Sequence, residues 1–279
     1  MGSQRKAQRN KGRTNSPAAR GRPNGRREVF AWVRRAVVAI AAGPAHDPDN
    51  PLDAFNKLAI LGSGFVVNSE KMIVVTAGHV VDPFIRAVNN AIASGAPAPP
   101  PPQVLFSGPM RNSQDGRAES VVHVAQVRRV QRSAHHDVAV LSVPVPEEAD
   151  VLRDVSVIGL PLAERGCEEG DEVAICGYPL GRNLHADLLG ANVPTFNPSF
   201  SQGIVSAVLP FSGAPLTART HFQVDAMINP GNSGGAIFDP VTGHVWGVVS
   251  SATNRVFKAL IQNPDGSNKV SDIEVPTGL

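Results

Sequence analysis

A serine held between glycines is the residue of this chain best suited to covalent chemistry. Ser233 lies in the glycine-rich segment Gly231–Gly235, just before an apolar run, where a side chain is poorly placed for packing and well placed for attack. Small neighbours also let backbone N–H groups surround a reacting carbonyl oxygen. Because glycine-bounded serines are common in loops, the prediction depends on whether a base and an orienting acid lie elsewhere in the chain.

A histidine and an aspartate at the ends of apolar segments can supply that base and acid. His79 follows the apolar run that begins at Met72, and Asp137 precedes the apolar run 138–143. Each is unremarkable alone, since a single histidine is usually a core or loop residue and a single aspartate a turn residue. Together with Ser233 they form the set that acyl transfer needs: a nucleophile, a base that takes its proton, and an acid that orients the base.

The order of the three residues along the chain separates three kinds of fold. The spacing Gly231-x-Ser-x-Gly235 also fits the nucleophile elbow of α/β-hydrolases, but that fold needs its acid and histidine after the serine, where only His244 is found. The subtilisin order would require an acid before His79 on a parallel sheet, and the chain lacks the βαβ alternation of such a sheet. The order His, Asp, Ser is that of chymotrypsin-like proteins.

Short strands must position these residues. The chain has 279 residues with 26 glycines, 24 prolines and few long helical patterns, which favours an all-β class. Apolar runs bounded by turns predict two sets of strands of similar size, and therefore two similar β-barrels. The runs of the first set are 36–41, 58–67, 72–81, 120–130 and 138–143, and those of the second are 155–160, 172–179, 202–209, 220–226, 236–238 and 244–251.

Charge and turn composition divide the chain into three parts. Residues 1–27 contain nine of the 26 Lys and Arg residues and no acid, leaving 17 basic against 24 acidic residues elsewhere, so they predict a disordered basic arm. Residues 28–150 should form the first barrel, led by a short helix at 28–35, and residues 151–279 the second. The acidic stretch 144–154 is the expected boundary, and the last strand of the second barrel is expected to be missing.

Two stretches predict long loops. Residues 83–103 contain a run of prolines and predict a polyproline-like surface loop, and residues 181–200 lack periodicity. The acidic turn Asp47–Asp53 lacks the central glycine of a calcium loop and has Leu58 in place of the bidentate acid, so no metal or cofactor is expected.

Compartment and partners are only weakly indicated by the sequence. Cys167 and Cys176 predict free thiols or a single hairpin disulfide, and a count of two gives no sign of an oxidising compartment, so a cytoplasmic location is expected. The apolar run 36–45 is too short to span a bilayer, but it leaves open export through a late signal-like segment near 27–45. The basic arm could bind nucleic acid or an anionic surface without sequence preference, or be a solvated tail. The oligomeric state stays open.

Four motifs, in this order, resemble the trypsin-like serine peptidases of the HtrA/Deg type. They are Gly62-Ser-Gly-Phe65, Val75-Thr-Ala-Gly-His79, Asp137-Val-Ala-Val-Leu141 and Asn229-Pro-Gly-Asn-Ser-Gly-Gly235, with weaker similarity at Gly177–Pro179, Gly203–Ser206 and Gln223–Ala226. The resemblance covers about residues 32–255, with no PDZ domain after it. It implies two six-stranded antiparallel β-barrels of the chymotrypsin/trypsin type, with the active site in the cleft between them.

The resemblance also implies roles for particular residues. His79, Asp137 and Ser233 would be the catalytic triad of a serine endopeptidase acting on protein or peptide substrates. The N–H groups of Gly231 and Ser233 would form the oxyanion hole. The alternative is a catalytically silent or partner-activated binding module on the same fold.

Substrate specificity follows from the loop positions of the same family. Met227 and Ile228 would line the base of the primary pocket, and Ser250 and Ser251 would run beside the substrate backbone, which pairs with them as an added strand. No acid lies at the expected pocket base. Cleavage after small or medium apolar residues is therefore expected, rather than cleavage after Lys or Arg.

Overall fold

The computed structural model describes residues 25–44, 57–112, 118–145, 157–179, 196–210, 221–250, 252–262 and 268–278. Several sequence predictions fall outside these residues: most of the basic arm, the acidic turn 47–53, most of the stretch 144–154, most of the loop 181–200, and Ser251.

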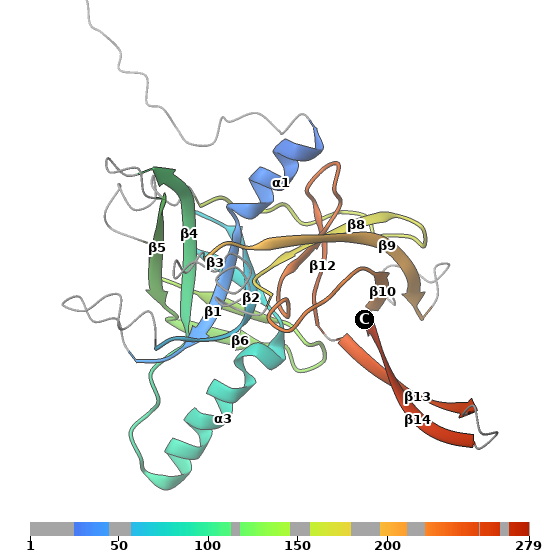
Figure 1. The fold of residues 1–279 in the computed structure, drawn as a ribbon. Coiled ribbons are helices and arrows are strands. Elements are labelled where there is room, and N and C mark those ends of the chain that lie inside the picture. Colours follow the sequence, from blue (N-terminus) through green and yellow to red (C-terminus); the bar gives the residue numbers. More distant parts are fainter. Residues whose placement is uncertain are drawn as a thin grey trace, which may run out of the picture.

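The first half of the chain forms one antiparallel sheet of seven strands (Figure 1). In chain order these are β1 (Val37–Ala42), β2 (Ala59–Asn68), β3 (Ile73–Thr76), β4 (Gln103–Asn112), β5 (Ala118–Gln126), β6 (Arg129–Arg132) and β7 (Ala139–Ser142). Hydrogen-bonded neighbours follow the order β5-β4-β1-β2-β3-β7-β6. The strand β3 therefore lies between β2 and β7, a placement that decides the geometry of the site.

The second half forms a five-stranded antiparallel sheet and a separate hairpin. The sheet contains β8 (Glu172–Gly177), β9 (Ser199–Leu209), β10 (His221–Asp225), β11 (Ala236–Phe238) and β12 (Val245–Val248), in the order β10-β9-β8-β11-β12. The hairpin pairs β13 (Ala252–Gln262) with β14 (Asn268–Gly278) and projects from the body in Figure 1. The predicted all-β fold built from two antiparallel barrels is confirmed, but the two curled sheets have seven and five described strands instead of the expected six each.

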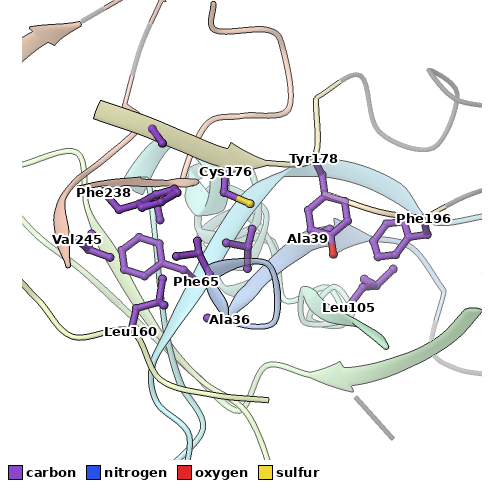
Figure 2. Packing of buried hydrophobic residues seen from close by; sticks show 14 of the residues in the cluster. Ala36, Ala39, Phe65, Leu105, Leu160, Cys176, Tyr178, Phe196, Phe238 and Val245 are labelled. Carbon is purple, nitrogen blue, oxygen red and sulfur yellow. The ribbon is translucent and has the colours of Figure 1, made fainter. Parts of the chain in front are cut away.

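Buried apolar side chains gather in three clusters. The first-sheet cluster includes Val38, Ile40 and Leu141, and the second-sheet cluster includes Ile175, Val205 and Ile237. A third, the shared cluster, draws side chains from both sheets (Figure 2). Its largest members are Phe65, Leu105, Leu160, Tyr178, Phe196 and Phe238. Because burying apolar surface is the main favourable term in folding, the shared cluster is what joins the two sheets.

The strand β1 is apolar at every position because both of its faces are buried. Val37, Ala39 and Ala41 point into the shared cluster, while Val38 and Ile40 point into the first-sheet cluster. Successive side chains of a strand face opposite sides, so a strand covered on both sides reads as a continuous apolar run. The prediction of a first strand within residues 36–41 is thereby confirmed.

Two helices of the described residues flank the sheets. The helix α1 (Arg26–Arg34) confirms the short helix expected at 28–35, and it buries Val29 and Val33, one turn apart, in the shared cluster. The second, α3 (Gly78–Ser94), continues through Pro83 and ends at Gly95. Among the described residues no helix is long and apolar enough to cross a membrane.

The helix α3 corrects the prediction that residues 83–103 are a polyproline-like loop. The helix occupies residues 83–94, and only the proline-rich stretch 96–102 before β4 is irregular. A single proline inside a helix removes one hydrogen bond without preventing the turns that follow it. Residues 84–94 contain no further proline or glycine, so this segment can form a helix despite the prolines that follow it.

Candidate active site

His79 and Asp137 lie at adjacent ends of two paired strands. The strand β3 ends at Thr76, β7 begins at Ala139, and these two residues are partners in the antiparallel ladder. His79 follows β3 as the second residue of α3, and Asp137 comes shortly before β7. Strand pairing therefore brings together two residues that are 58 positions apart in the sequence.

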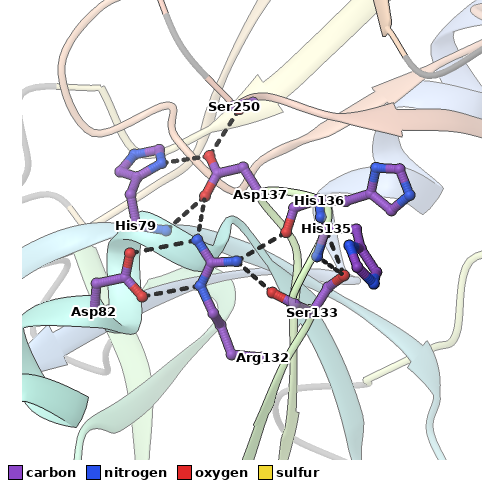
Figure 3. A network of polar contacts seen from close by, with 8 residues as sticks. All are labelled: His79, Asp82, Arg132, Ser133, His135, His136, Asp137 and Ser250. Carbon is purple, nitrogen blue, oxygen red and sulfur yellow. Dashed lines mark hydrogen bonds and ion pairs between the residues drawn. The ribbon is translucent and has the colours of Figure 1, made fainter.

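The side chains of His79 and Asp137 are joined by a hydrogen bond of 2.6 Å between Nδ1 and Oδ2 (Figure 3). The His79 backbone N–H donates to Asp137 Oδ1 at 2.7 Å, and the Ser250 hydroxyl donates to Oδ2 at 2.7 Å. Partial burial favours the neutral acid, but these hydrogen bonds outweigh it and lower the pKa of Asp137 below its ordinary value. An ionised carboxylate at Nδ1 leaves Nε2 as the proton acceptor, on a side chain that is 45% exposed.

Arg132 supports Asp137 from another side (Figure 3). Its Nε donates to Asp82 Oδ1 at 3.0 Å, and its Nη2 lies 3.7 Å from Asp137 Oδ1. Its Nη1 donates to the carbonyls of Ser133 and His136, the latter at 3.0 Å. The hydrogen bond with Asp82 raises the pKa of the Arg132 guanidinium above its ordinary value. This cation ties α3 and β6 to the turn that carries Asp137.

Ser233 lies in the turn before β11, in the second half of the chain, and this turn is anchored to the first sheet. Its carbonyl accepts a hydrogen bond of 2.7 Å from the N–H of Ser63 in β2, and the next N–H, of Gly234, donates to Val249 at 2.7 Å. Gly234 has φ of +85°, and a Cβ there would lie 2.1 Å from the Ser63 carbonyl oxygen. Only glycine can therefore occupy the position after Ser233.

The predicted oxyanion-hole donors, the N–H groups of Gly231 and Ser233, differ from the other N–H groups of their turn. Within the part of the chain that the structure describes, no acceptor binds the N–H of Gly231 or of Ser233. The neighbouring N–H groups all donate, that of Asn232 at 3.0 Å, that of Gly234 at 2.7 Å and that of Gly235 at 2.8 Å. Two unpaired donors on a partly exposed turn are suited to bind a developing negative charge.

Of the three predicted catalytic residues, His79 and Asp137 are joined by hydrogen bonds. The hydrogen bonds between described residues do not include one between the Ser233 hydroxyl and His79. Such bonds are commonly long or misaligned without a bound substrate and shorten when it binds.

The predicted specificity residues differ in their surroundings. Met227 is 71% exposed, whereas Ile228 is half-buried against the second-sheet cluster. The Ser250 side chain is engaged with Asp137, so only its backbone remains for the predicted pairing with substrate. Among the described residues of this set, Met227, Ile228 and Ser250, the side chain of Met227 is the most exposed.

Several other sequence predictions concern groups around the site. His135 and His136, which precede Asp137 in the chain, are exposed. Cys167 and Cys176 are buried and not joined by a disulfide, and burial raises the pKa of the Cys176 thiol. No group of three His, Cys, Asp or Glu side chains that could hold a metal occurs among the described residues.

The sequence did not point to three residues that shape this site. The sequence does contain an indication for Asp82: this residue lies three positions after His79, which would place both side chains on the same face of a helix. Ser63 lies inside the motif Gly62–Phe65, but the motif alone does not indicate what its hydroxyl binds. Arg132 carried no signal, since its partner Asp82 lies 50 positions away.

Part of this chain is similar in sequence to a known protein. The human "Peroxisomal leader peptide-processing protease" is 27% identical over 123 residues, which are 44% of this chain and 18% of that protein. The chain thus spans less than a fifth of the length of that relative.

Two solved structures are similar at low identity. The Rv3671c protease from M. tuberculosis in its active form is 20% identical, with 81% of this chain and 74% of that chain covered and a TM-score of 0.47. The serine endoprotease from Yersinia pestis is 21% identical, with coverage of 83% and 59% and a TM-score of 0.46.

The family assignment rests on a match over more than half of the chain. The family model described as "Trypsin-like peptidase domain" matches residues 62–248, a range that contains His79, Asp137 and Ser233. The chain therefore belongs to the family of trypsin-like peptidase domains.

Proposed function

We propose that this chain is a serine endopeptidase that hydrolyses peptide bonds through an acyl-enzyme. Ser233 Oγ attacks the scissile carbonyl carbon while His79 Nε2 takes the serine proton. The imidazolium then gives that proton to the leaving nitrogen, so the C–N bond breaks and the acyl group stays on Ser233. A water molecule then attacks the ester with the same proton transfers, releasing the carboxylic acid and restoring the serine.

The observation that carries the proposal is the hydrogen bond of 2.6 Å between His79 and Asp137. A base at this position must accept a proton at Nε2 and must be stabilised once it is an imidazolium. Asp137 meets both needs, because its lowered pKa keeps it ionised and its Oδ2 fixes the tautomer. The free N–H groups of Gly231 and Ser233 support the proposal further, since the oxyanion of the tetrahedral intermediate needs donors.

Within the family we assign the chain to the HtrA/Deg type, on the motifs that precede His79 and surround Ser233. We further propose cleavage after small or medium apolar residues. The exposed Met227 and the half-buried Ile228 would provide an apolar surface for such a side chain. The expected base of this pocket contains no acidic residue.

Digestion of an unfolded protein, with every cleavage site mapped, tests both proposals at once. Cuts should fall mainly after Val, Ala or Leu. Ser233→Ala and His79→Ala should each lower kcat by at least about 10⁴-fold, because the triad residues act as a unit. The matched control is His135→Ala, which removes an exposed histidine close to the site and should leave the rate unchanged.

A fluorophosphonate probe separates the enzyme from the alternative of a silent or partner-activated module. Labelling of the wild-type protein that disappears in Ser233→Ala supports the endopeptidase. An unlabelled wild-type protein supports the module, and dominant cuts after Arg or Lys would contradict the proposed specificity.

A further inference from the structure

A single buried serine makes four hydrogen bonds beneath the turn that carries Ser233. Ser63, in the middle of β2, has no exposed surface. Its hydroxyl donates to the Gly231 carbonyl at 2.6 Å, and its N–H donates to the Ser233 carbonyl at 2.7 Å. Its hydroxyl also accepts from the Tyr178 N–H at 2.8 Å, and its carbonyl accepts from the Thr76 hydroxyl at 2.6 Å.

The direction of the Ser63 hydroxyl proton follows from its partners. A hydroxyl has one proton to donate, and the Tyr178 N–H can only donate to it. The proton must therefore point to the Gly231 carbonyl. Space for this oxygen depends on Gly177, because a Cβ at that position would lie 2.9 Å from Ser63 Oγ.

Ser63 thus holds the carbonyls of the same two residues whose N–H groups are free. Gly231 has no side chain to restrict its φ and ψ angles, so its conformation must be fixed from outside. Ser63 fixes the peptide after Gly231 at its carbonyl end, and the hydrogen bond of 3.0 Å from Asn232 N–H to Asn229 fixes the other end. The bond from Ser63 N–H then fixes the peptide after Ser233.

We propose that Ser63 is a positioning residue for the oxyanion hole: it acts through the Gly231 and Ser233 carbonyls to keep their N–H groups aimed at the reacting carbonyl oxygen. The inference rests on the proposed peptidase function. Oxyanion donors act mainly in the transition state, so disturbing their aim lowers kcat and leaves substrate binding largely intact.

The kinetic test compares Ser63→Ala with a matched substitution. In Ser63→Ala, kcat should fall by about 10- to 100-fold with KM within about 3-fold of wild type, less than the roughly 10²- to 10³-fold cost of deleting a donor. Ser107→Ala is the control, because it also removes a hydroxyl that donates to a backbone carbonyl, that of Phe196, at 2.8 Å. That carbonyl lies outside the Gly231–Gly235 turn, so kcat should stay at the wild-type value.

A second measurement reads the turn without using activity. Amide hydrogen exchange across residues 229–235 should be faster in Ser63→Ala than in wild type and unchanged in Ser107→Ala, because the carbonyls of the turn lose an anchor. If Ser63→Ala does not fold, Ser63→Cys takes its place with the same expectation, since a thiol is a much weaker donor.

The outcomes separate this inference from the proposed function. Faster exchange in Ser63→Ala together with an inactive wild-type protein would support the positioning role and contradict the peptidase. An active wild-type protein with kcat within 2-fold in folded Ser63→Ala, or with an equal loss in Ser107→Ala, would overturn the positioning role and leave the peptidase standing.

Discussion

At the scale of single residues, the number of donors on Asp137 exceeds what orienting a histidine requires. The hydrogen bond between His79 Nδ1 and Asp137 Oδ2 is enough to orient the imidazole. Ser250 adds a further hydrogen bond to the same oxygen, Oδ2. Each donor favours the ionised carboxylate over the neutral acid. Together they overcome the opposing effect of burial, so the charge of Asp137 is set by its neighbours.

Ser250→Ala should therefore destabilise the protein in a pH-dependent way. The folded-state pKa of Asp137 is lowered, so the stabilisation is present above the unfolded-state pKa of about 3.9 and is lost as the pH falls through the folded-state pKa. Removing the Ser250 donor raises the folded-state pKa and should cost about 1–2 kcal/mol of unfolding free energy at neutral pH.

Urea unfolding of Ser250→Ala and wild type, measured between pH 7 and pH 2, checks this expectation. The difference in unfolding free energy should shrink below about pH 4. The control is Ser94→Ala, whose hydroxyl bonds a helix carbonyl at 2.8 Å and should give a difference that does not change with pH. A Ser250→Ala difference that is constant with pH would show that the hydroxyl does not act through the charge of Asp137.

At the scale of elements, the pairing of β3 with β7 is what brings His79 next to Asp137. The order of residues in the sequence was enough to select His79 and Asp137, because each follows or precedes an apolar strand. The sequence could not show that Thr76 and Ala139 are ladder partners, since β-pairing is decided by packing between distant segments. The continuous apolar run of β1 was predictable, whereas α3 was hidden by Pro83 and the proline run after it.

The guanidinium of Arg132 joins elements in a way that no local pattern predicts. Arg132→Ala should release Asp82 and the turn 133–137, lower the melting temperature, and reduce kcat/KM by up to about 10²-fold if the acid shifts by an ångström. Arg132→Lys should be intermediate, because an ammonium keeps the charge but cannot reproduce the planar fork of donors.

The melting temperature and kcat/KM are measured for Arg132→Ala, Arg132→Lys and the control Arg129→Ala. Arg129 is an exposed arginine of the same strand, so the variant controls for loss of a cation from β6. If Arg132→Lys matched Arg132→Ala in both melting temperature and activity, the retained charge would contribute nothing. If neither differed from Arg129→Ala, Arg132 would have no positioning role.

At the scale of the whole molecule, the site exists only while the two sheets stay together. His79 and Asp137 lie just beyond the ends of β3 and β7 of the first sheet, and Ser233 precedes β11 of the second. The shared cluster joins the sheets through large buried side chains, among them Phe65 from β2 and Phe238 from β11 (Figure 2). A core common to both sheets predicts that they unfold as one cooperative unit.

The two tryptophans of the chain allow this cooperativity to be measured. Trp32 packs against the shared cluster and Trp246 against the second-sheet cluster. In Trp246→Phe the fluorescence reports Trp32, and in Trp32→Phe it reports Trp246. Both variants should therefore give the same urea midpoint, which should also match the midpoint measured by circular dichroism.

Phe238→Ala provides the decisive comparison, because Phe238 is fully buried and its truncation should cost about 3–5 kcal/mol. Introduced into each single-tryptophan background, it should lower both midpoints equally. Val241→Ala, at a position that is 67% exposed, should shift neither by more than about 0.5 kcal/mol. If Phe238→Ala moved the Trp246 midpoint alone, the second sheet would unfold by itself, and the shared cluster could not be what holds Ser233 against the first sheet.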